Sequence, residues 1–287
     1  MRYEAPETLD AAVALLAGSP GDARILAGGT DLLVQLKTEI IAPDIVIDIK
    51  RIGEVREIKR EADGSFRIGA AVTGAELKEH AELKTVWPGV VEAANLIGST
   101  QVQGRATLGG NLCNGSPAAD SVPAVIAAGA VAIIAGPGGR REEPVENIML
   151  APRKLSLAKG EFVVAFVLQP RPAHAADAYL RFIPRTEMDI AVVGAGVSLA
   201  LDDKGVVTAA RVGLGAVAAR PLLVPEAASA LIGTSLDEAA LARLDEAARA
   251  ACKPIDDKRG TREFRIKVAG VMARRAAQKA YERARSR

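Results

Sequence analysis

The apolar residues in the N-terminal part of the chain follow both helical and strand-like spacings. Leu9, Val13 and Leu16 recur at helical spacing, with Thr8 at the N-cap position and Gly18 as a stop, which predicts a helix over 9–17. A second helix is predicted over 32–38. Short apolar runs bounded by turn residues predict strands at 24–27, 45–49, 55–59 and 66–70.

The middle of the chain continues this mixture of helices and strands. Thr73 can cap a helix that runs through Leu83, and Trp87-Pro88 begins another that runs to about Ile97. Pro117 suits the first turn of a helix that ends at Ala127. The pattern further predicts a hairpin with a Gly-Pro-Gly-Gly turn and a separate strand, at 130–143 and 162–168.

Pro170 and Pro172 interrupt the pattern, so we place a domain boundary there, with one domain over 1–172 and another over 173–287. The second domain has three strand-like runs and then three helical patterns, at 178–183, 190–201, 206–214, 225–232, 237–251 and 262–285. Strands followed by helices are typical of an α+β fold, which is the predicted class.

Composition and charge exclude several partners. Lys and Arg number 37 against 35 Asp and Glu, and the net charge of +2 gives no reason to expect nucleic acid or an anionic membrane. Aromatic residues make up 3% of the chain, and we find no aromatic platform on which bases could stack. The longest apolar stretch, 122–135, is shorter than the roughly 20 residues of a membrane helix, and the first residues do not resemble a signal peptide.

The chain has two cysteines, Cys113 and Cys252, and two histidines, His80 and His174. Two thiols are too few for a four-cysteine iron–sulfur cluster, and the spacing of these four residues does not indicate tetrahedral zinc, so no metal site is predicted. A disulfide framework is not indicated, which favours a reduced, cytoplasmic setting. We predict that both cysteines are packing residues.

A first glycine loop follows the strand at 24–27. The segment Leu26-Ala-Gly-Gly-Thr-Asp-Leu-Leu33 places Gly28 and Gly29 between that strand and the helix at 32–38. Paired glycines allow backbone to approach a ligand closely, and their N–H groups can form an anion site at a helix start. The alternative is a tight turn capped by Thr30 or Asp31.

A second glycine loop, Thr107-Leu-Gly-Gly-Asn111, precedes Ser116-Pro-Ala-Ala-Asp120. Thr107, Asn111 and Asp120 add side chains that can hydrogen-bond to hydroxyl groups. Two such loops fit a ligand with adjoining phosphates, a dinucleotide, although each loop alone is also compatible with a capped turn.

Two other nucleotide motifs are not supported. Neither glycine loop carries the lysine of a P-loop. The segment Gly213-Leu-Gly-Ala-Val-Ala218 fits a loose dinucleotide fingerprint, but Arg220-Pro221 follows where that fingerprint needs a helix, so we reject it.

Four segments together resemble a known family: LAGGTDLL at 26–33, TLGGN at 107–111, SPAAD at 116–120 and MDIAVVG at 188–194. They look like the FAD-binding medium subunit of molybdenum hydroxylases, the carbon monoxide dehydrogenase and xanthine dehydrogenase family, and the resemblance covers essentially the whole chain. It implies a two-lobed FAD-binding domain of the vanillyl-alcohol-oxidase (PCMH) type, followed by a small α+β domain with a three-stranded sheet and helices.

The resemblance also implies the residues that bind FAD. Two groups match the pyrophosphate loops, one acid matches the residue that meets the ribityl or ribose part, and three further residues stand where relatives contact the cofactor. The implied site is Ala27, Gly28, Gly29, Thr30, Asp31, Leu32, Ile97, Thr107, Leu108, Gly109, Gly110, Asn111, Asp120, Val163 and Arg181. No residue is assigned as catalytic.

In similar assemblies a large subunit holds the molybdenum cofactor and a small subunit holds two [2Fe–2S] clusters. The resemblance thus implies an oxidoreductase subunit that passes electrons from those clusters through FAD to an external acceptor, within a dimer of heterotrimers. Two alternatives stay open. One is a stand-alone FAD oxidoreductase of the same superfamily, such as a UDP-N-acetylenolpyruvoylglucosamine reductase type, and the other is a flavin-free assembly scaffold.

Two remaining features have plain structural interpretations. Asp189 is interpreted as part of a turn that enters a strand rather than as a residue that orients a loop near the flavin. The basic segment 262–287 is predicted to dock through an apolar stripe, with its charged face in solvent or against an acidic partner. The residues of that stripe are Phe264, Val268, Val271 and Met272.

Overall fold

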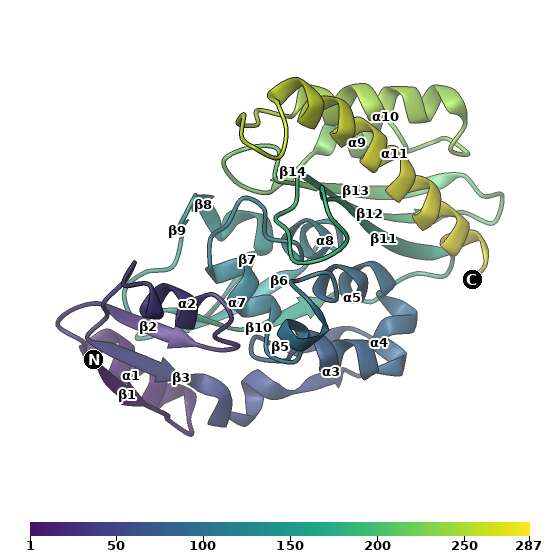
Figure 1. Cartoon of the computed structure of the whole chain (residues 1–287). Coiled ribbons are helices and arrows are strands. Elements are labelled where there is room, and N and C mark those ends of the chain that lie inside the picture. The colour runs from purple at the N-terminus through teal and green to yellow at the C-terminus, as the bar shows by residue number, and fades with distance from the viewer.

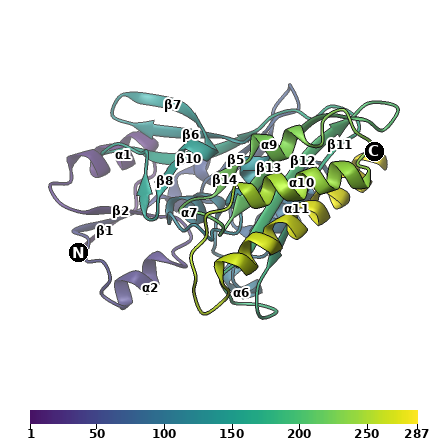
Figure 2. The ribbon, with the colours of Figure 1, turned by 90° about the horizontal axis from the view of Figure 1, so that it is seen from above.

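The computed structural model describes all 287 residues and begins with a small parallel sheet (Figure 1). Its strands are β1 (Arg2–Glu4), β3 (Ile45–Asp48) and β2 (Ala23–Leu26), in the order β1-β3-β2. Helix α1 (Leu9–Gly18) is capped as predicted, because the Thr8 hydroxyl accepts a hydrogen bond from the N–H of Ala11 at 3.2 Å. Helix α2 (Leu32–Lys37) follows β2 and projects from the body of the molecule (Figure 2).

A second lobe is built on an antiparallel sheet whose central strand is buried on both faces. The strand order is β4 (Ile58–Arg60), β5 (Phe66–Gly69), β10 (Phe162–Leu168), β6 (Val131–Gly136) and β7 (Gly139–Pro144). Phe166 of β10 packs in the core of this lobe, whereas Phe162 and Val164 of the same strand pack with the parallel sheet. One strand therefore joins the two lobes.

The remaining elements of the first domain are short. They are η1 (Ile49–Arg51), η2 (Gly53–Arg56), α3 (Gly74–Glu79), α4 (Ala81–Val86), α5 (Pro88–Ala94), α6 (Thr100–Gln103), α7 (Leu108–Cys113), α8 (Val122–Ala127), η3 (Val145–Asn147), β8 (Met149–Ala151) and β9 (Lys154–Leu155). The strand predicted at 55–59 is shifted, because Val55 lies in η2 and strand pairing starts at Ile58.

Two helix predictions are wrong in their boundaries. The helix predicted from Thr73 breaks at His80, whose Nδ1 accepts a hydrogen bond from the N–H of Leu83 and so caps a separate helix, α4. The helix predicted from Pro117 starts instead at Val122. Asn111 explains this delay, because its Oδ1 accepts hydrogen bonds from both the N–H and the hydroxyl of Ser121 and holds the segment before the helix as a turn.

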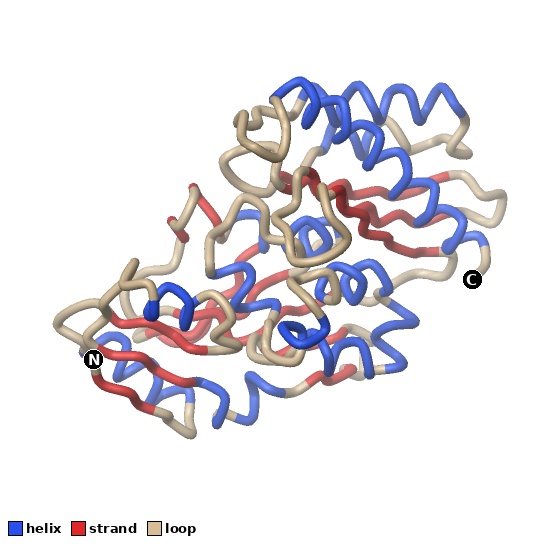
Figure 3. The backbone as a smooth tube through the Cα atoms, viewed as in Figure 1, coloured by secondary structure: helices blue, strands red, loops and turns tan.

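The C-terminal part forms the expected α+β unit, coloured green to yellow in Figure 1. Its antiparallel sheet contains β11 (Ala175–Phe182), β12 (Val193–Leu201) and β13 (Val207–Gly215), to which the structure adds a short fourth strand, β14 (Leu222–Leu223). The helices are α9 (Pro225–Ser229), α10 (Glu238–Ala250) and α11 (Arg262–Arg285). In Figure 3 these helices lie on one side of the sheet, and the other side faces α5 and α8.

The glycines near the end of β13 have a packing function. A Cβ at Gly213 would come closer than 3.0 Å to the carbonyl oxygen of Pro123, and one at Gly215 would lie 2.6 Å from Cγ of the same proline. The missing side chains let the start of α8 lie directly against the sheet. This packing accounts for the glycines of the rejected fingerprint.

The docking stripe predicted for α11 is partly wrong. Phe264 and Val271 are 40% and 36% exposed, whereas the buried face consists mainly of small residues such as Ala269, Ala273 and Ala280. An alanine face lets the helix axis approach the sheet closely, and it gives a weaker apolar signal than larger side chains.

Part of the basic face of α11 has a partner within the chain. Glu92 on α5 accepts hydrogen bonds from the Lys279 ammonium at 2.8 Å and from the Arg283 guanidinium at 3.1 Å. These charges therefore tie α11 to the first domain instead of facing solvent.

Candidate functional site

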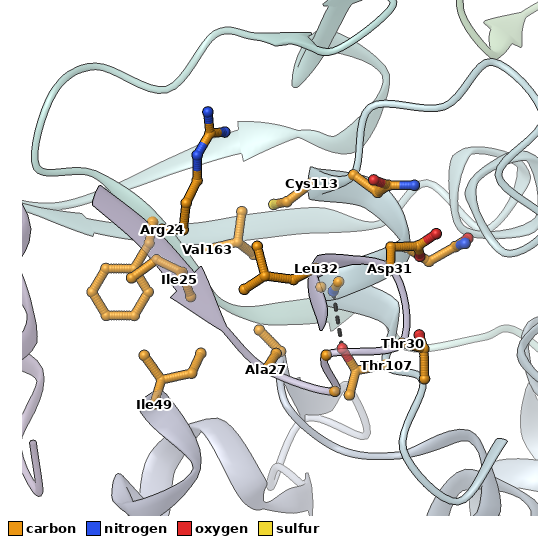
Figure 4. Close-up of a pocket in the computed structure, with 18 of the residues that line it drawn as sticks. Arg24, Ile25, Ala27, Thr30, Asp31, Leu32, Ile49, Thr107, Cys113 and Val163 are labelled. Carbon is orange, nitrogen blue, oxygen red and sulfur yellow. Dashed lines mark hydrogen bonds between the residues drawn. The ribbon is translucent and has the colours of Figure 1, made fainter. Parts of the chain in front are cut away.

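A cavity of about 300 Å³ lies where the two lobes of the first domain meet. Its walls come from β2, the first glycine loop, α2, α7, β9 and β10. In Figure 4, Ile25 and Val163 lie on one side of it, and Thr30, Asp31 and Thr107 lie on the other. The cavity thus has an apolar part and a polar part, as small-molecule sites commonly do.

The two glycine loops come into contact. A Cβ at Gly28 would come closer than 3.0 Å to the carbonyl oxygen of Arg105, so a side chain there would force the loops apart. Gly29 adopts φ +81°, in the left-handed region. The N–H groups from Gly28 to Leu32 donate to no acceptor in the protein. The first loop therefore offers a run of free donors at the start of α2.

The second loop uses its amides differently, although its sequence looks alike. Gly109 donates to the carbonyl of Ala70 at 3.2 Å, and Gly110 donates to the hydroxyl of Thr107 at 2.9 Å. Asn111 donates to the carbonyl of Thr107, also at 2.9 Å. Thr107 is the N-cap of α7, so these amides belong to the first turn of a helix. The expectation that the second loop, like the first, offers free backbone amides to a ligand is thus wrong.

The glycines of the second loop serve its packing instead. A Cβ at Gly109 would lie 2.6 Å from the carbonyl oxygen of Ala70, which is fixed backbone. At Gly110 the nearest atom would be the Thr107 hydroxyl oxygen at 3.0 Å, which belongs to a side chain that can move. The second loop therefore contributes a tightly packed wall to the cavity, and Gly109 is the glycine that this packing requires.

Most of the residues predicted from the sequence meet at this cavity. Those that line it are Ala27, Gly28, Gly29, Thr30, Asp31, Leu32, Ile97, Thr107, Gly109, Gly110, Asn111 and Val163. Three others do not line it. Leu108 is buried in the core of the second lobe, and Asp120 and Arg181 form an ion pair elsewhere.

Asp120, in the turn before α8, and Arg181, on β11, form a buried ion pair. The Arg181 guanidinium donates to Oδ2 of Asp120 at 2.8 Å, and Oδ1 of Asp120 has no hydrogen-bond partner. Burial raises the pKa of the Asp120 carboxyl to about 6, although Arg181 acts in the opposite direction. The neighbouring Tyr179 hydroxyl is also buried without a partner. These groups have unused hydrogen-bonding capacity.

Some lining residues were not predicted from the sequence. Gln35 and Asn114 line the cavity and are hydrogen-bonded to each other at 3.0 Å. Helical spacing could have identified Gln35, since it lies three residues after Leu32 on the same helix face. Arg153 gave no sequence signal, because its place depends on the packing of its backbone against Gly115.

The interpretations of Cys113 and Asp189 can be compared with the structure. Cys113 is half-buried: it packs against the core of the second lobe, as predicted, and it also lines the cavity. Burial raises the pKa of its thiol to about 12. Asp189 lies just before β12 and bonds the guanidinium groups of Arg259 and Arg185. The hydrogen bond from Arg259 is the main cause that lowers the pKa of Asp189 to about 2, as expected for a carboxylate that fixes a turn.

The structure contains neither a membrane-spanning helix nor a metal-binding cluster. None of its helices combines the length and the apolar character that a membrane span requires. No group of three or more His, Cys, Asp and Glu side chains is arranged to hold a metal ion.

Comparison with known proteins gives a consistent result. The family model described as the FAD binding domain in molybdopterin dehydrogenase matches residues 1–171, and the model of the CO dehydrogenase flavoprotein C-terminal domain matches residues 178–280. The chain is 34% identical to the carbon monoxide dehydrogenase medium chain of Afipia carboxidovorans, over 99% of this chain and 98% of that one. It is 32% identical to the xanthine dehydrogenase FAD-binding subunit of Escherichia coli O157:H7, over 97% and 95%.

The fold also matches that of a solved structure. Superposition on a chain of the reconstituted CO dehydrogenase from Oligotropha carboxidovorans gives a TM-score of 0.94 at 34% identity, covering 99% of this chain and 98% of the other. Both domains and the cavity between the glycine loops lie within this match.

Proposed function

The chain belongs to the molybdenum hydroxylase family as its FAD-binding subunit, and on this premise we propose that FAD binds in the cavity beside the two glycine loops. We propose further that electrons reach this FAD from the iron–sulfur clusters of a partner subunit and leave it to an external acceptor. The subunit is an oxidoreductase component, and its own residues hold the cofactor.

The run of free N–H groups from Gly28 to Leu32 is the observation that carries this proposal. Gly28, Gly29, Thr30 and Leu32 are half-buried beside the cavity, and a run of adjacent donors without protein partners there fits a ligand with several acceptors. A diphosphate offers such acceptors with negative charge, and each hydrogen bond to a charged group contributes roughly 1.5–3 kcal/mol. A few of these bonds can hold the diphosphate without a lysine or arginine in the loop.

The other walls of the cavity fit the rest of a dinucleotide. Ile25, Ile49 and Phe162 supply an apolar surface that suits an aromatic ring. On the polar side, Asn111 uses its Oδ1 for Ser121 and keeps its NH₂ group free to donate. The required glycines, packed against neighbouring backbone, fit a site in which the chain itself approaches the cofactor.

Asp120 and Arg181 are retained as proposed contacts, although they lie outside the cavity wall. Oδ1 of Asp120 is a buried acceptor without a partner, and a ribityl hydroxyl would satisfy it. Such a bond would favour the ionised form of Asp120, whose pKa is raised by burial in the cofactor-free chain. Arg181 would then keep a positive charge near the cofactor.

FAD, when bound, can exchange electrons with iron–sulfur clusters and with a soluble acceptor, and this redox chemistry belongs to the cofactor. The chain's residues orient it, exclude water from it and set the local charge. We place the molybdenum cofactor and two [2Fe–2S] clusters on a large and a small partner subunit, in a dimer of heterotrimers. The division into domains at 1–172 and 173–287 and a cytoplasmic location, supported by two free cysteines, belong to the same proposal.

The experiment that tests this function uses the full chain and its complex. The purified chain is titrated with FAD, and one equivalent is expected to bind with a flavin absorption spectrum. Co-purification with its partners, followed by analysis for molybdenum and iron, is expected to give both metals. A colourless chain that does not bind added FAD would refute the cofactor site, and a complex without iron would refute the electron path.

A further inference from the structure

Helix α2 covers one side of the cavity, yet it is not anchored in any core. None of its six residues is buried, and its outward side chains Leu33 and Val34 are 54% and 57% exposed. It continues directly from the first glycine loop, where the N–H of Leu33 donates to the carbonyl of Gly29 at 2.9 Å. Figure 2 shows the helix standing away from both sheets. Its position therefore depends on a few local contacts rather than on packing.

One of those contacts reaches across the cavity to the second lobe. The Gln35 side-chain NH₂ donates to Oδ1 of Asn114 at 3.0 Å, and both side chains line the cavity. Asn114 is held firmly, because its own N–H donates to the carbonyl of Gly110 at the end of α7. Gln35 belongs to the loosely held helix. The bond thus connects an anchored residue to an unanchored element on the opposite wall.

We propose that Gln35 and Asn114 form a clasp that holds α2 over the bound dinucleotide. The inference rests on the proposed function, since it takes FAD as the molecule that the clasp retains. When the clasp is closed, the orientation of α2 is fixed, and the N–H groups of Gly28 and Gly29 just before it stay directed at the diphosphate. Opening the clasp lets α2 move outward with those amides. Gln35 and Asn114 are positioning residues in this scheme.

The clasp has a kinetic signature that direct ligand contacts would not show. If the two side chains act only through each other, removing either one abolishes the whole effect, and removing both does nothing more. If each bonded the cofactor separately, the two losses would multiply. Loss of the clasp opens the entrance of the cavity, so FAD enters and leaves faster. The association and dissociation rate constants then both rise, and the equilibrium affinity changes less than either rate constant.

The test measures the association and dissociation rates of FAD with the full chain, using the change in flavin fluorescence on binding and on dilution. The variants are Gln35→Ala, Asn114→Ala, the double variant, and the pair Gln35→Lys with Asn114→Asp, which restores a bond of opposite charges. Matched controls are Gln101→Ala and Asn147→Ala, whose side chains bond Ser99 and Glu143 away from the cavity.

Loss of one neutral hydrogen bond predicts a dissociation rate about three- to tenfold faster. The same factor is expected for both single variants and for the double variant, with near wild-type rates for the exchanged pair and both controls. Multiplying effects, unchanged rates, or an exchanged pair as fast as the double variant would overturn the clasp. Failure of the wild-type chain to bind FAD would instead overturn the proposed function, and this shows before any variant is made.

Discussion

Four glycines, each next to another glycine in the sequence, are expected to differ sharply in how much their replacement by alanine lowers FAD affinity or stability. At Gly28 the added Cβ meets the carbonyl oxygen of Arg105 at less than 3.0 Å, and at Gly109 it meets that of Ala70 at 2.6 Å. Both obstacles are backbone. At Gly110 the obstacle is a side-chain hydroxyl at 3.0 Å, and at Gly138, in a surface hairpin, nothing lies within 4 Å.

The magnitude for Gly28→Ala follows from the contact. To reach an ordinary separation, the two loops must move apart by about 1 Å, and a hydrogen bond of ordinary length does not survive that displacement. Loss of even one bond between a first-loop amide and a charged phosphate oxygen costs about 1.5–3 kcal/mol. This corresponds to a dissociation constant for FAD that is roughly 10- to 100-fold higher. Gly109→Ala is expected to act mainly on the fold, because its amide already bonds Ala70.

Gly110→Ala is expected to change FAD affinity by less than about threefold, since alanine improves helix propensity by up to ~1 kcal/mol and only the Thr107 hydroxyl must shift. Gly138→Ala is the matched control and should behave as wild type. The assay is a fluorescence titration with FAD, paired with thermal unfolding of the cofactor-free chain. Wild-type affinity in Gly28→Ala, or equal damage in Gly110→Ala, would refute the reasoning.

Three further changes test other parts of the structure. Burial raises the pKa of Asp120 from 3.8 to about 6, so between these values the folded chain holds a proton that the unfolded chain releases. The stability of wild type relative to Asp120→Asn should therefore fall by about 2 kcal/mol from pH 4 to pH 7 in urea unfolding, and a constant difference would contradict this. Cys252 is buried and the pKa of its thiol is raised to about 12, so it should resist a thiol reagent at pH 8 until the chain is unfolded; rapid labelling of Cys252 in the native chain would contradict its packing in the core. Arg265→Met should lower the free energy of unfolding by about 3 kcal/mol or more, because the buried guanidinium donates to the carbonyl of Val192 and to the carboxylate of Asp257. Lys267 is exposed on the same helix, so Lys267→Met should have little effect and serves as the control.

Local signals in the sequence located most of the fold. The cap at Thr8, the apolar run of β10 and the glycine turn between β6 and β7 each act within a few residues, so pattern alone found those elements. The break at His80 was missed because a histidine side chain takes the capping position there. The late start of α8 was missed because the bonds from Ser121 to Asn111 are tertiary.

The candidate site shows the same limit. Twelve of the fifteen predicted residues line the cavity, because the glycine pairs are visible motifs. The sequence could not show that the N–H groups of Gly109 and Gly110 donate to acceptors within the protein, since the acceptors are the carbonyl of Ala70 and the hydroxyl of Thr107. Nor could it pair Gln35 with Asn114, because neither residue type at those positions distinguishes a clasp from a surface amide.

The amides of the first glycine loop are free and those of the second are hydrogen-bonded within the protein, so the two similar motifs are under different evolutionary constraints. The first loop leaves its amide donors for the cofactor, so a change that only misdirects these amides is penalised when the cofactor is needed, although the fold itself requires glycine at Gly28 beside the backbone of Arg105. The amides of the second loop bond within the protein, so a change at Gly109 is penalised whether or not the cofactor is bound. A descendant that abandoned electron transfer would be expected to keep Gly28 and Gly109 and to vary at the other positions of the first loop.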